Sequence, residues 1–188
     1  MRLAIIAVIV ITIIALFYFV LKRSPDIKDV EIESMGNLVI KSSAFKNNDF
    51  IPAKHTCDGD NVNPFIEILN APAGTKSIAL IMDDPDATGG VTWDHWLLWN
   101  MEPKTHYIPE DSVPGNAILG TTSFGKANYG GPCPPKGSEP HRYMFKVYAL
   151  DSVLVLDEGA SKSELLKAIE GHVLDDGLLV GLYQRAGN

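Results

Sequence analysis

Hydrophobic positions in this chain form one long run near the N-terminus, followed by shorter segments in which apolar and polar residues alternate. The run extends from Leu3 to Leu21 and contains one polar residue, Thr12. A helix rises about 1.5 Å per residue, so this run would span roughly 28 Å, close to the hydrocarbon thickness of a bilayer. The pattern predicts an N-terminal transmembrane helix that anchors the chain through residues 1–23.

A cleaved signal peptide is the alternative interpretation of this run. Signal peptides have a shorter apolar core of about 7–15 residues and a cleavage site of small residues. The run is longer than that, and neither such a cleavage site nor a cysteine that could carry a lipid follows it. Lys22, Arg23 and Lys28 favour a cytoplasmic location for the residues that follow. Short N-terminal anchors of prokaryote-like chains nevertheless often export their domain, and we expect a membrane-anchored, single-pass protein with an extracytoplasmic domain.

The chain beyond the run predicts a domain of β-strands. Residues 24–36 are charged and contain a proline, which is typical of a linker, and residues 37–188 are expected to form the domain. Strands are indicated in NLVIKSSAF, around residues 65–69 and in GLLVGLYQR. One helix is indicated in SKSELLKAIEGH, where Ser161 and Glu164 form a capping box and Gly171 suits the C-terminal end. Several strands with one clear helix predict a mostly β domain built as a sandwich.

Three further strands carry the residues of chemical interest. The apolar run Ile78–Met82 indicates a buried strand that ends in a group of aspartates. The segment WDHWLLWNM alternates, which places Trp93, His95 and Leu97 on one face. The segment HRYMFKVYALD alternates in the same way, and its first residue and every second residue after it share a face: His141, Tyr143, Phe145 and Val147.

The charge of the chain limits the partners of the domain. The formal net charge is −7, and without Arg2, Lys22 and Arg23 the other 13 basic residues face 23 acidic ones, a balance of −10. An acidic surface of this kind argues against nucleic acid or anionic lipid as a partner over a wide area. A small anion can still bind in a locally positive pocket.

The two cysteines, Cys57 and Cys133, are too few for a zinc site and do not dictate a disulfide framework. An extracytoplasmic domain permits one disulfide between them. Two free thiols in loops are the alternative, and the sequence leaves both open.

Three segments combine residue types that suit an anion pocket: DDPDA from Asp83, WDHW from Trp93 and GPCPPKGSEPHRY from Gly131. Histidine and tyrosine side chains can donate hydrogen bonds to an oxyanion, and neighbouring carboxylates fix the tautomer of a histidine. The prolines restrict the backbone and reduce the entropy lost on binding. Each segment alone is equally typical of a turn or a core strand, but their joint occurrence favours a pocket.

Together with TCDGDNVNP, FGKANYGGPCPPKG and EGHVLDDGLLVGLYQR, these motifs resemble the phosphatidylethanolamine-binding proteins. The bacterial and archaeal Raf-kinase-inhibitor-like branch is the most similar, and the resemblance covers roughly Val39 to Arg185. It implies an antiparallel β-sandwich with one or two short helices, here preceded by the predicted transmembrane helix. It also implies a pocket at one end that binds phosphate, acetate and phosphorylated headgroups.

The resemblance also implies the residues of the pocket. They include an entrance tryptophan, a proline, and a glycine whose lack of a Cβ lets backbone N–H groups approach the anion. The full set is Asp84, Asp86, Trp93, His95, Gly131, Pro135, His141 and Tyr143. Arg142 alternates to the opposite strand face and is expected to be structural. The chain departs from the family pattern at Thr88 and Gly89, where proline is frequent, and at Glu139, where glycine is frequent.

The leading functional hypothesis is a non-catalytic binding protein for a small anion or phosphorylated headgroup, acting as a regulator or inhibitor of partner proteins. We expect no cofactor and no metal. A protease or kinase inhibitor that acts through an exposed loop is one alternative. Another is a metal- or His/Asp-dependent hydrolase built from Asp84, Asp86, His95 and His141. The sequence contains no H-E-x-x-H motif and no Ser or Cys nucleophile in a recognisable elbow, which disfavours the hydrolase.

Overall fold

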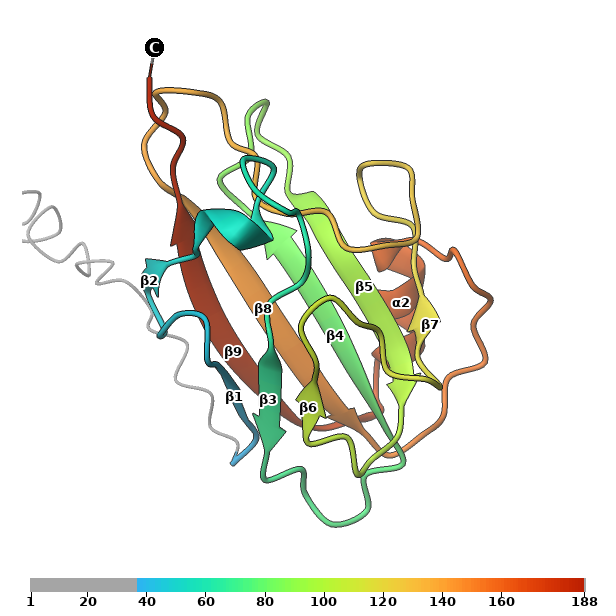
Figure 1. Cartoon of the computed structure of the whole chain (residues 1–188). Coiled ribbons are helices and arrows are strands. Elements are labelled where there is room, and N and C mark those ends of the chain that lie inside the picture. Colours follow the sequence, from blue (N-terminus) through green and yellow to red (C-terminus); the bar gives the residue numbers. More distant parts are fainter. Residues whose placement is uncertain (1–36, 188) are drawn as a thin grey trace, which may run out of the picture. The chain divides into compact units, whose positions relative to one another are not determined.

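Two β-sheets of unequal size pack face to face in the computed structural model of the chain, which describes residues 37–187 (Figure 1). The smaller sheet has the strand order β1-β3-β6. Its strands are β1 (Val39–Ser42), β3 (Ile66–Leu69) and β6 (Tyr107–Ile108). The larger sheet has the order β2-β9-β8-β4-β5-β7. Its strands are β2 (Asp49–Phe50), β9 (Val173–Tyr183), β8 (His141–Leu150), β4 (Ser77–Asp84), β5 (Trp93–Met101) and β7 (Ile118–Leu119).

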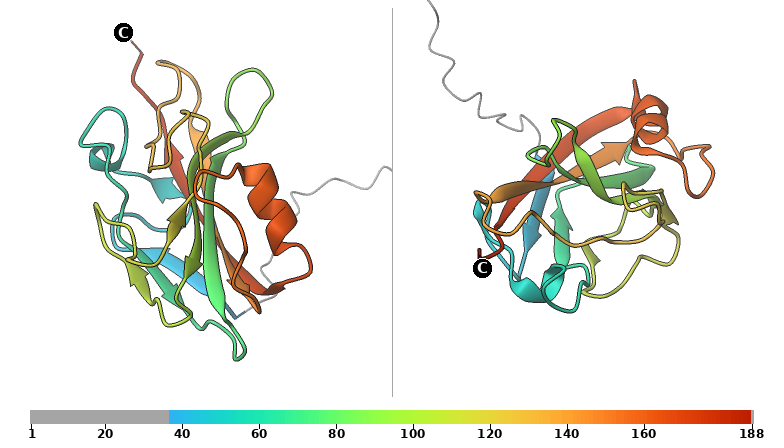
Figure 2. Two further views of the ribbon diagram at one scale, coloured as in Figure 1. Left: turned by 90° about the vertical axis from the view of Figure 1, so that its right-hand side faces the viewer. Right: turned by 90° about the horizontal axis from the view of Figure 1, so that it is seen from above.

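All neighbouring strands are antiparallel except β2 and β9, which pair in parallel. The long central strands β4, β5, β8 and β9 form the body of the sandwich. The 3-10 helix η1 (Ala53–His55) lies in the loop between β2 and β3. The helix α2 (Lys162–Ile169) lies on the face of the large sheet opposite the small sheet, as the turned view of Figure 2 shows.

The large sheet is therefore covered on both faces, and the domain has two apolar cores. The first core lies between the sheets, where Ile66 and Ile68 of the small sheet meet Met82 and Phe145 of the large one. The second core lies under α2 and includes side chains of β4, β5 and the helix: Ala79, Ile81, Leu97, Trp99, Leu165 and Ile169. Burial on both faces explains why the run in β4 is apolar throughout rather than alternating.

The predicted helix is confirmed, together with both of its end signals. Ser161 is the N-cap residue and forms a capping box with Glu164. The helix ends at Ile169, and Gly171 follows with a φ of +78°, a conformation that glycine adopts without strain. Lys162 at the start of the helix donates hydrogen bonds to Asp83 (2.6 Å) and Asp94 (2.8 Å) on the sheet. The side chain of Asp83 thus helps to hold α2 against the sheet and faces away from the inter-sheet core.

The predicted fold class needs one correction. The mostly β sandwich is present, but among residues 37–187 no helix is long and apolar enough to cross a membrane. The helix α2 has eight residues, of which Leu165 and Ile169 are buried. The segment of the predicted transmembrane helix, residues 1–23, and the predicted linker, residues 24–36, lie outside the described residues.

A disulfide between Cys57 and Cys133 joins the loop after η1 to the proline-rich loop before β8. Of the two alternatives that the sequence left open, the structure contains the bonded one. Further hydrogen bonds support the same junction, from Cys57 N–H to the Pro132 carbonyl (3.1 Å) and from the Tyr129 hydroxyl to the His55 carbonyl (2.7 Å). The disulfide and these hydrogen bonds join the two loops, whose cysteines are 76 residues apart in the sequence, into one continuous surface segment.

Removing this disulfide should destabilise the domain. In the chain-entropy account, closing a loop of this length stabilises a fold by about 4 kcal/mol. A variant with both Cys57→Ser and Cys133→Ser should lose about that much free energy of unfolding in a denaturant titration. A reductant should lower the stability of the wild type but not of the double variant. Equal stability of the two proteins under oxidising conditions would contradict the prediction.

Candidate functional site

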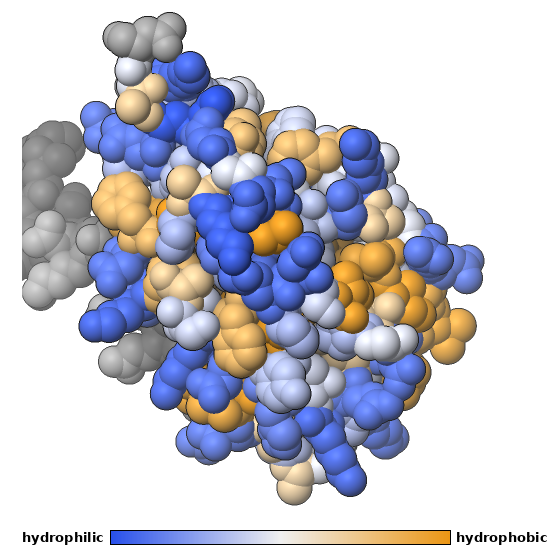
Figure 3. Space-filling model, in the orientation of Figure 1, coloured by the Kyte–Doolittle hydropathy of each residue, from blue (hydrophilic) through white to orange (hydrophobic). Residues whose placement is uncertain are grey.

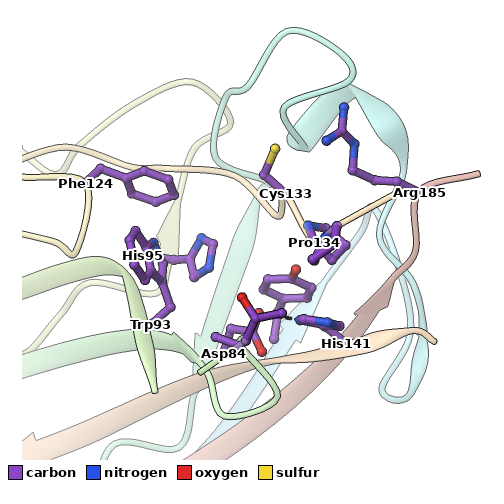
Figure 4. A pocket seen from close by; sticks show the side chains of 12 residues that line it. Asp84, Trp93, His95, Phe124, Cys133, Pro134, His141 and Arg185 are labelled. Atoms are coloured by element: carbon purple, nitrogen blue, oxygen red, sulfur yellow. Dashed lines mark hydrogen bonds and ion pairs between the residues drawn. The ribbon is translucent and has the colours of Figure 1, made fainter. Parts of the chain in front are cut away.

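An open cavity of about 380 Å³ lies at the end of the sandwich where β4 finishes and β5 and β8 begin. Figure 4 shows its side chains converging from these strands, from the proline-rich loop and from the C-terminal segment. The lining residues are Asp84, Ala87, Thr88, Trp93, His95, Phe124, Cys133, Pro134, Pro135, His141, Tyr143 and Arg185. Loops and strand ends on a rigid β scaffold are a frequent location for ligand sites.

A buried Asp–His pair forms the floor of the cavity. His141 Nδ1 lies 2.8 Å from Asp84 Oδ2, and both residues are almost fully buried. The other carboxylate oxygen of Asp84 accepts a hydrogen bond of 2.8 Å from the backbone N–H of Asp86. Because the carboxylate accepts from Nδ1, the imidazole is held in one orientation and Nε2 remains for a ligand.

A β-bulge places His95 in the cavity. Met82 of β4 pairs with Trp96, but the next residue, Asp83, pairs with Asp94, so His95 is the extra residue of β5. A bulge turns its side chain out of the regular alternation and is frequent beside functional sites. The predicted grouping of Trp93, His95 and Leu97 on one face is therefore wrong for Leu97, which packs in the core under α2.

His95 has one ring nitrogen, Nε2, without a hydrogen-bond partner among the described residues. Its Nδ1 donates a hydrogen bond of 2.6 Å to the carbonyl oxygen of Gly130, so Nε2 carries the lone pair in the neutral ring. Nε2 is also buried. Burial lowers the pKa of His95, and the Gly130 hydrogen bond and the nearby charges of Asp84, Asp94 and Asp83 offset this only in part. The free ring is accordingly neutral near pH 7.

Tyr143 brings a second unpartnered polar atom to the same place. Its hydroxyl is buried and makes no hydrogen bond of ordinary geometry within residues 37–187. Burial is the main cause that raises its pKa, and the negative charge of Asp84 adds to this effect. The phenol therefore keeps its proton and can act as a donor. The Tyr143 ring also packs edge to face against His95, with centroids 5.1 Å apart.

The rim of the cavity has one aromatic side and one charged side. Trp93 and Phe124 form the aromatic side, packed edge to face at 5.5 Å and each more than a third exposed. Arg185 lies beyond Pro134 on the other side (Figure 4). Its guanidinium donates to the carboxylate of Asp58, with a shortest distance of 2.8 Å from Nη2 to Oδ1. Asp58 also accepts a hydrogen bond of 2.8 Å from the Tyr183 hydroxyl.

Residues 41–184 match the sequence model of a family described as "Phosphatidylethanolamine-binding protein". This match covers most of the chain. The chain belongs to the phosphatidylethanolamine-binding protein family. The resemblance noted from the sequence motifs is thereby confirmed.

Relatives in archaea and bacteria agree with this membership. A UPF0098 protein of Pyrococcus horikoshii is 50% identical over 151 residues, which cover 77% of this chain and 75% of the relative. The crystal structure of a phosphatidylethanolamine-binding protein homologue, CT736 of Chlamydia trachomatis, is 35% identical with a TM-score of 0.75, and the match covers 79% of this chain and 97% of the homologue. E. coli YbcL, described as a member of the mammalian family, is 31% identical with a TM-score of 0.74, covering 78% and 98% respectively.

Six of the eight residues that the family resemblance implied for the pocket line one cavity in the structure. These are Asp84, Trp93, His95, Pro135, His141 and Tyr143. Asp86 does not line it: its carboxylate forms a two-oxygen pair with the Arg142 guanidinium, at 2.8 Å from Nε and 2.7 Å from Nη2. The loop turns after Asp84, so Asp86 serves the site through its backbone N–H and not through its side chain.

Gly131 is the second departure from the expected pocket. Its backbone N–H donates a hydrogen bond of 2.8 Å to Asn61 Oδ1 and is therefore not offered to an anion. A Cβ at this position would lie 2.5 Å from both Asn61 Oδ1 and the His55 carbonyl oxygen. The close approach of the two loops is therefore sufficient to require glycine at this position.

Sequence reasoning missed Phe124 and Arg185. Phe124 is the first residue of the motif FGKANYGGPCPPKG, but it lies in a loop whose path the sequence does not predict, and Arg185 follows the last strand by only two residues. The motif VGLYQR contains Arg185, but nothing in a strand pattern shows that its side chain lies at the rim. Ala87, Thr88, Cys133 and Pro134 complete the wall; Thr88 directly follows the motif DDPDA, and the other three lie within motifs that had been singled out.

The Tyr143 hydroxyl is expected to serve a ligand rather than the fold. A buried hydroxyl without a partner costs free energy, so Tyr143→Phe should leave the free energy of unfolding unchanged or raise it by about 1 kcal/mol. Denaturant unfolding of the wild type and the variant measures the difference. Phe145→Leu, a substitution in the core between the sheets, provides the contrast and should destabilise the domain. A loss of about 2 kcal/mol or more in Tyr143→Phe would show that the hydroxyl is structural.

Proposed function

We propose that this domain is a non-catalytic binding protein whose cavity takes a small anion, such as a phosphate group on a larger molecule. The observation that carries the proposal is a pair of unpartnered buried atoms, His95 Nε2 and the Tyr143 hydroxyl oxygen, on two residues that line one open cavity. Buried polar groups in proteins nearly always have partners. Two exceptions at the same cavity are accounted for if a polar ligand supplies the missing partners.

The chemistry of the floor favours an oxyanion over other polar ligands. Tyr143 retains its proton and donates. His141 directs Nε2 away from the carboxylate that fixes its ring, and this nitrogen donates when the ring is protonated beside Asp84. His95 donates from Nε2 once it takes up a proton. Three donors around one cavity match the several oxygens of a phosphate or a carboxylate.

The rest of the molecule is consistent with a small ligand. On the face of the domain shown in Figure 3, hydrophobic residues form separate patches among hydrophilic ones. The family to which the chain belongs is named for phosphatidylethanolamine, a molecule with a phosphate in its headgroup. The aromatic side of the rim, Trp93 and Phe124, would contact the part of the ligand next to the anionic group.

The hydrolase alternative has less support from the described part of the chain. Residues 37–187 contain no cluster of three or more His, Cys, Asp or Glu side chains placed to hold a metal ion. Cys133 lies at the cavity, but its sulfur is bonded to Cys57, so the disulfide form offers no thiolate nucleophile.

Replacing His141 should abolish binding while the domain stays folded. His141→Ala removes a hydrogen-bond donor to a charged ligand, for which we expect an affinity loss of about a hundredfold for methyl phosphate by calorimetry. The matched control is His172→Ala. His172 Nδ1 lies 2.8 Å from Asp151 Oδ1 in the same kind of pair, but this pair is exposed and does not line the cavity. An unchanged affinity in His141→Ala would refute the assignment of the cavity.

Binding should also be linked to proton uptake by His95. A bound anion favours the imidazolium, so it should raise the pKa of His95 from its lowered value in the free protein. The affinity should then fall as the pH rises between the pKa of the free protein and the higher pKa of the complex, by up to about tenfold per pH unit. Sulfate is a suitable probe because it does not titrate in this range.

Calorimetry of sulfate binding near pH 7, in two buffers of different ionisation enthalpy, measures the protons taken up. The uptake should be largely lost in His95→Asn, which separates the contribution of His95 from that of His141. If the wild type binds sulfate without proton uptake, His95 does not donate to the anion.

A further inference from the structure

The rim of the cavity contains one residue with a permanent positive charge, Arg185. The floor below it contains the Asp84 carboxylate, hydrogen-bonded to His141. Arg185 is partly exposed, with 23% of its side-chain surface accessible. The ion pair with Asp58 explains how the Arg185 side chain is held. It does not explain why this side chain borders the cavity, since an ion pair between two loops needs no opening beside it.

The backbone around Arg185 is fixed to the cavity wall. The Gly137 N–H donates to the Arg185 carbonyl oxygen (3.0 Å), and the side chain of Gln184 donates to the Ser138 carbonyl oxygen (2.7 Å). Residues 136 and 185 form an isolated parallel bridge. The C-terminal segment is thus a continuation of the proline-rich wall.

Asp58 fixes the guanidinium itself. Nε lies 3.1 and 3.0 Å from the two carboxylate oxygens, and Nη2 lies 2.8 Å from one of them. Within the described residues, the hydrogen bonds of this side chain involve Nε and Nη2, which leaves the donors of Nη1. Asp58 follows Cys57, whose disulfide ends at Cys133 in the wall. An arginine held this rigidly loses little entropy when it contacts a ligand.

The charge on Arg185 also selects among ligands. Attraction to a fixed cation grows with the charge of the anion, so a dianion gains more than a monoanion. A phosphate monoester carries close to two negative charges above its second pKa of about 6 and has three terminal oxygens. A phosphate diester carries one charge and has two terminal oxygens. The donors of the floor can serve either ligand, whereas the rim cation favours the monoester.

We propose that Arg185 is an anion-binding residue of the cavity, held in place by Asp58, and that it makes the site select dianionic phosphate monoesters over diesters. This inference rests on the proposed function and narrows its ligand class. Asp58 has two opposing effects on binding: it positions the guanidinium, and its own charge weakens the attraction for the ligand.

The two partners should therefore respond in opposite directions when substituted. Arg185→Gln should lower the affinity for methyl phosphate about tenfold and that for dimethyl phosphate about threefold or less. Asp58→Asn removes the competing charge and should raise the affinity for methyl phosphate by about threefold. If the ion pair had only a structural role, both variants would change binding in the same direction or not at all.

The test is an NMR titration at pH 7.5 of the full chain and its variants with methyl phosphate and dimethyl phosphate. Arg185→Lys keeps the charge but loses the two-oxygen pairing, so it should be destabilised like Arg185→Gln yet retain most of the affinity for methyl phosphate. Arg142→Gln is the matched control, because Arg142 forms a similar pair with Asp86 outside the cavity. Thermal unfolding of each variant identifies any loss of the fold.

The outcomes separate the two hypotheses. The proposal is supported if the preference of the wild type for methyl phosphate collapses in Arg185→Gln and rises in Asp58→Asn. Unchanged affinities in both variants, with binding still lost in His141→Ala, would overturn the role of Arg185 and leave the proposed function standing. If the wild type binds neither probe, both the proposed function and this inference fail.

Discussion

The hydrogen bond between Asp84 and His141 is the interaction on which the candidate site depends. It joins the last residue of β4 to the first residue of β8, and both side chains are almost fully buried. A buried carboxylate is costly unless it is paired and hydrogen-bonded, and the imidazole and the Asp86 N–H meet that need. The antiparallel pairing of β4 with β8 brings these ends together, so the geometry of the floor follows from the register of the sheet.

The site combines this satisfied pair with groups that the fold leaves unsatisfied. Four buried side-chain polar atoms lack a partner in the described residues, and two of them, on His95 and Tyr143, belong to cavity-lining residues. The bulge in β5 accounts for the position of His95, because it turns this side chain out of the regular alternation and against the Tyr143 ring. A regular strand would have paired β5 more completely but would have carried His95 to the other face. Local departure from regular structure at a functional site is the expected pattern.

The sequence predicted those parts of the molecule that follow from local patterns. The apolar run of β4, the alternation of β8 and the capping box of α2 are each encoded within about ten residues, and each appears as expected. The bulge at His95 was not predictable, because it depends on the register against β4 rather than on β5 alone. Asp86 and Gly131, which the family resemblance assigned to the pocket, do not line the cavity, and the reason is related. Both residues are close to the cavity in sequence, but tertiary partners, Arg142 and Asn61, take their polar groups.

The floor and the rim of the cavity come from different kinds of structure. The floor is built from residues of β4, β5 and β8, so the register of the sheet brings these groups together. Apart from Trp93 at the start of β5, the rim is built from Phe124, the proline-rich loop and the C-terminal segment, which lie outside the strands. Loops tolerate sequence change more readily than the elements they connect. Family membership therefore bears most directly on the floor, whereas the proposed selection among ligands rests on the rim of this protein. The disulfide strengthens this point, because it ties Asp58, and through it Arg185, to the wall. A rim fixed in this way can discriminate between ligands that a mobile loop would accept equally.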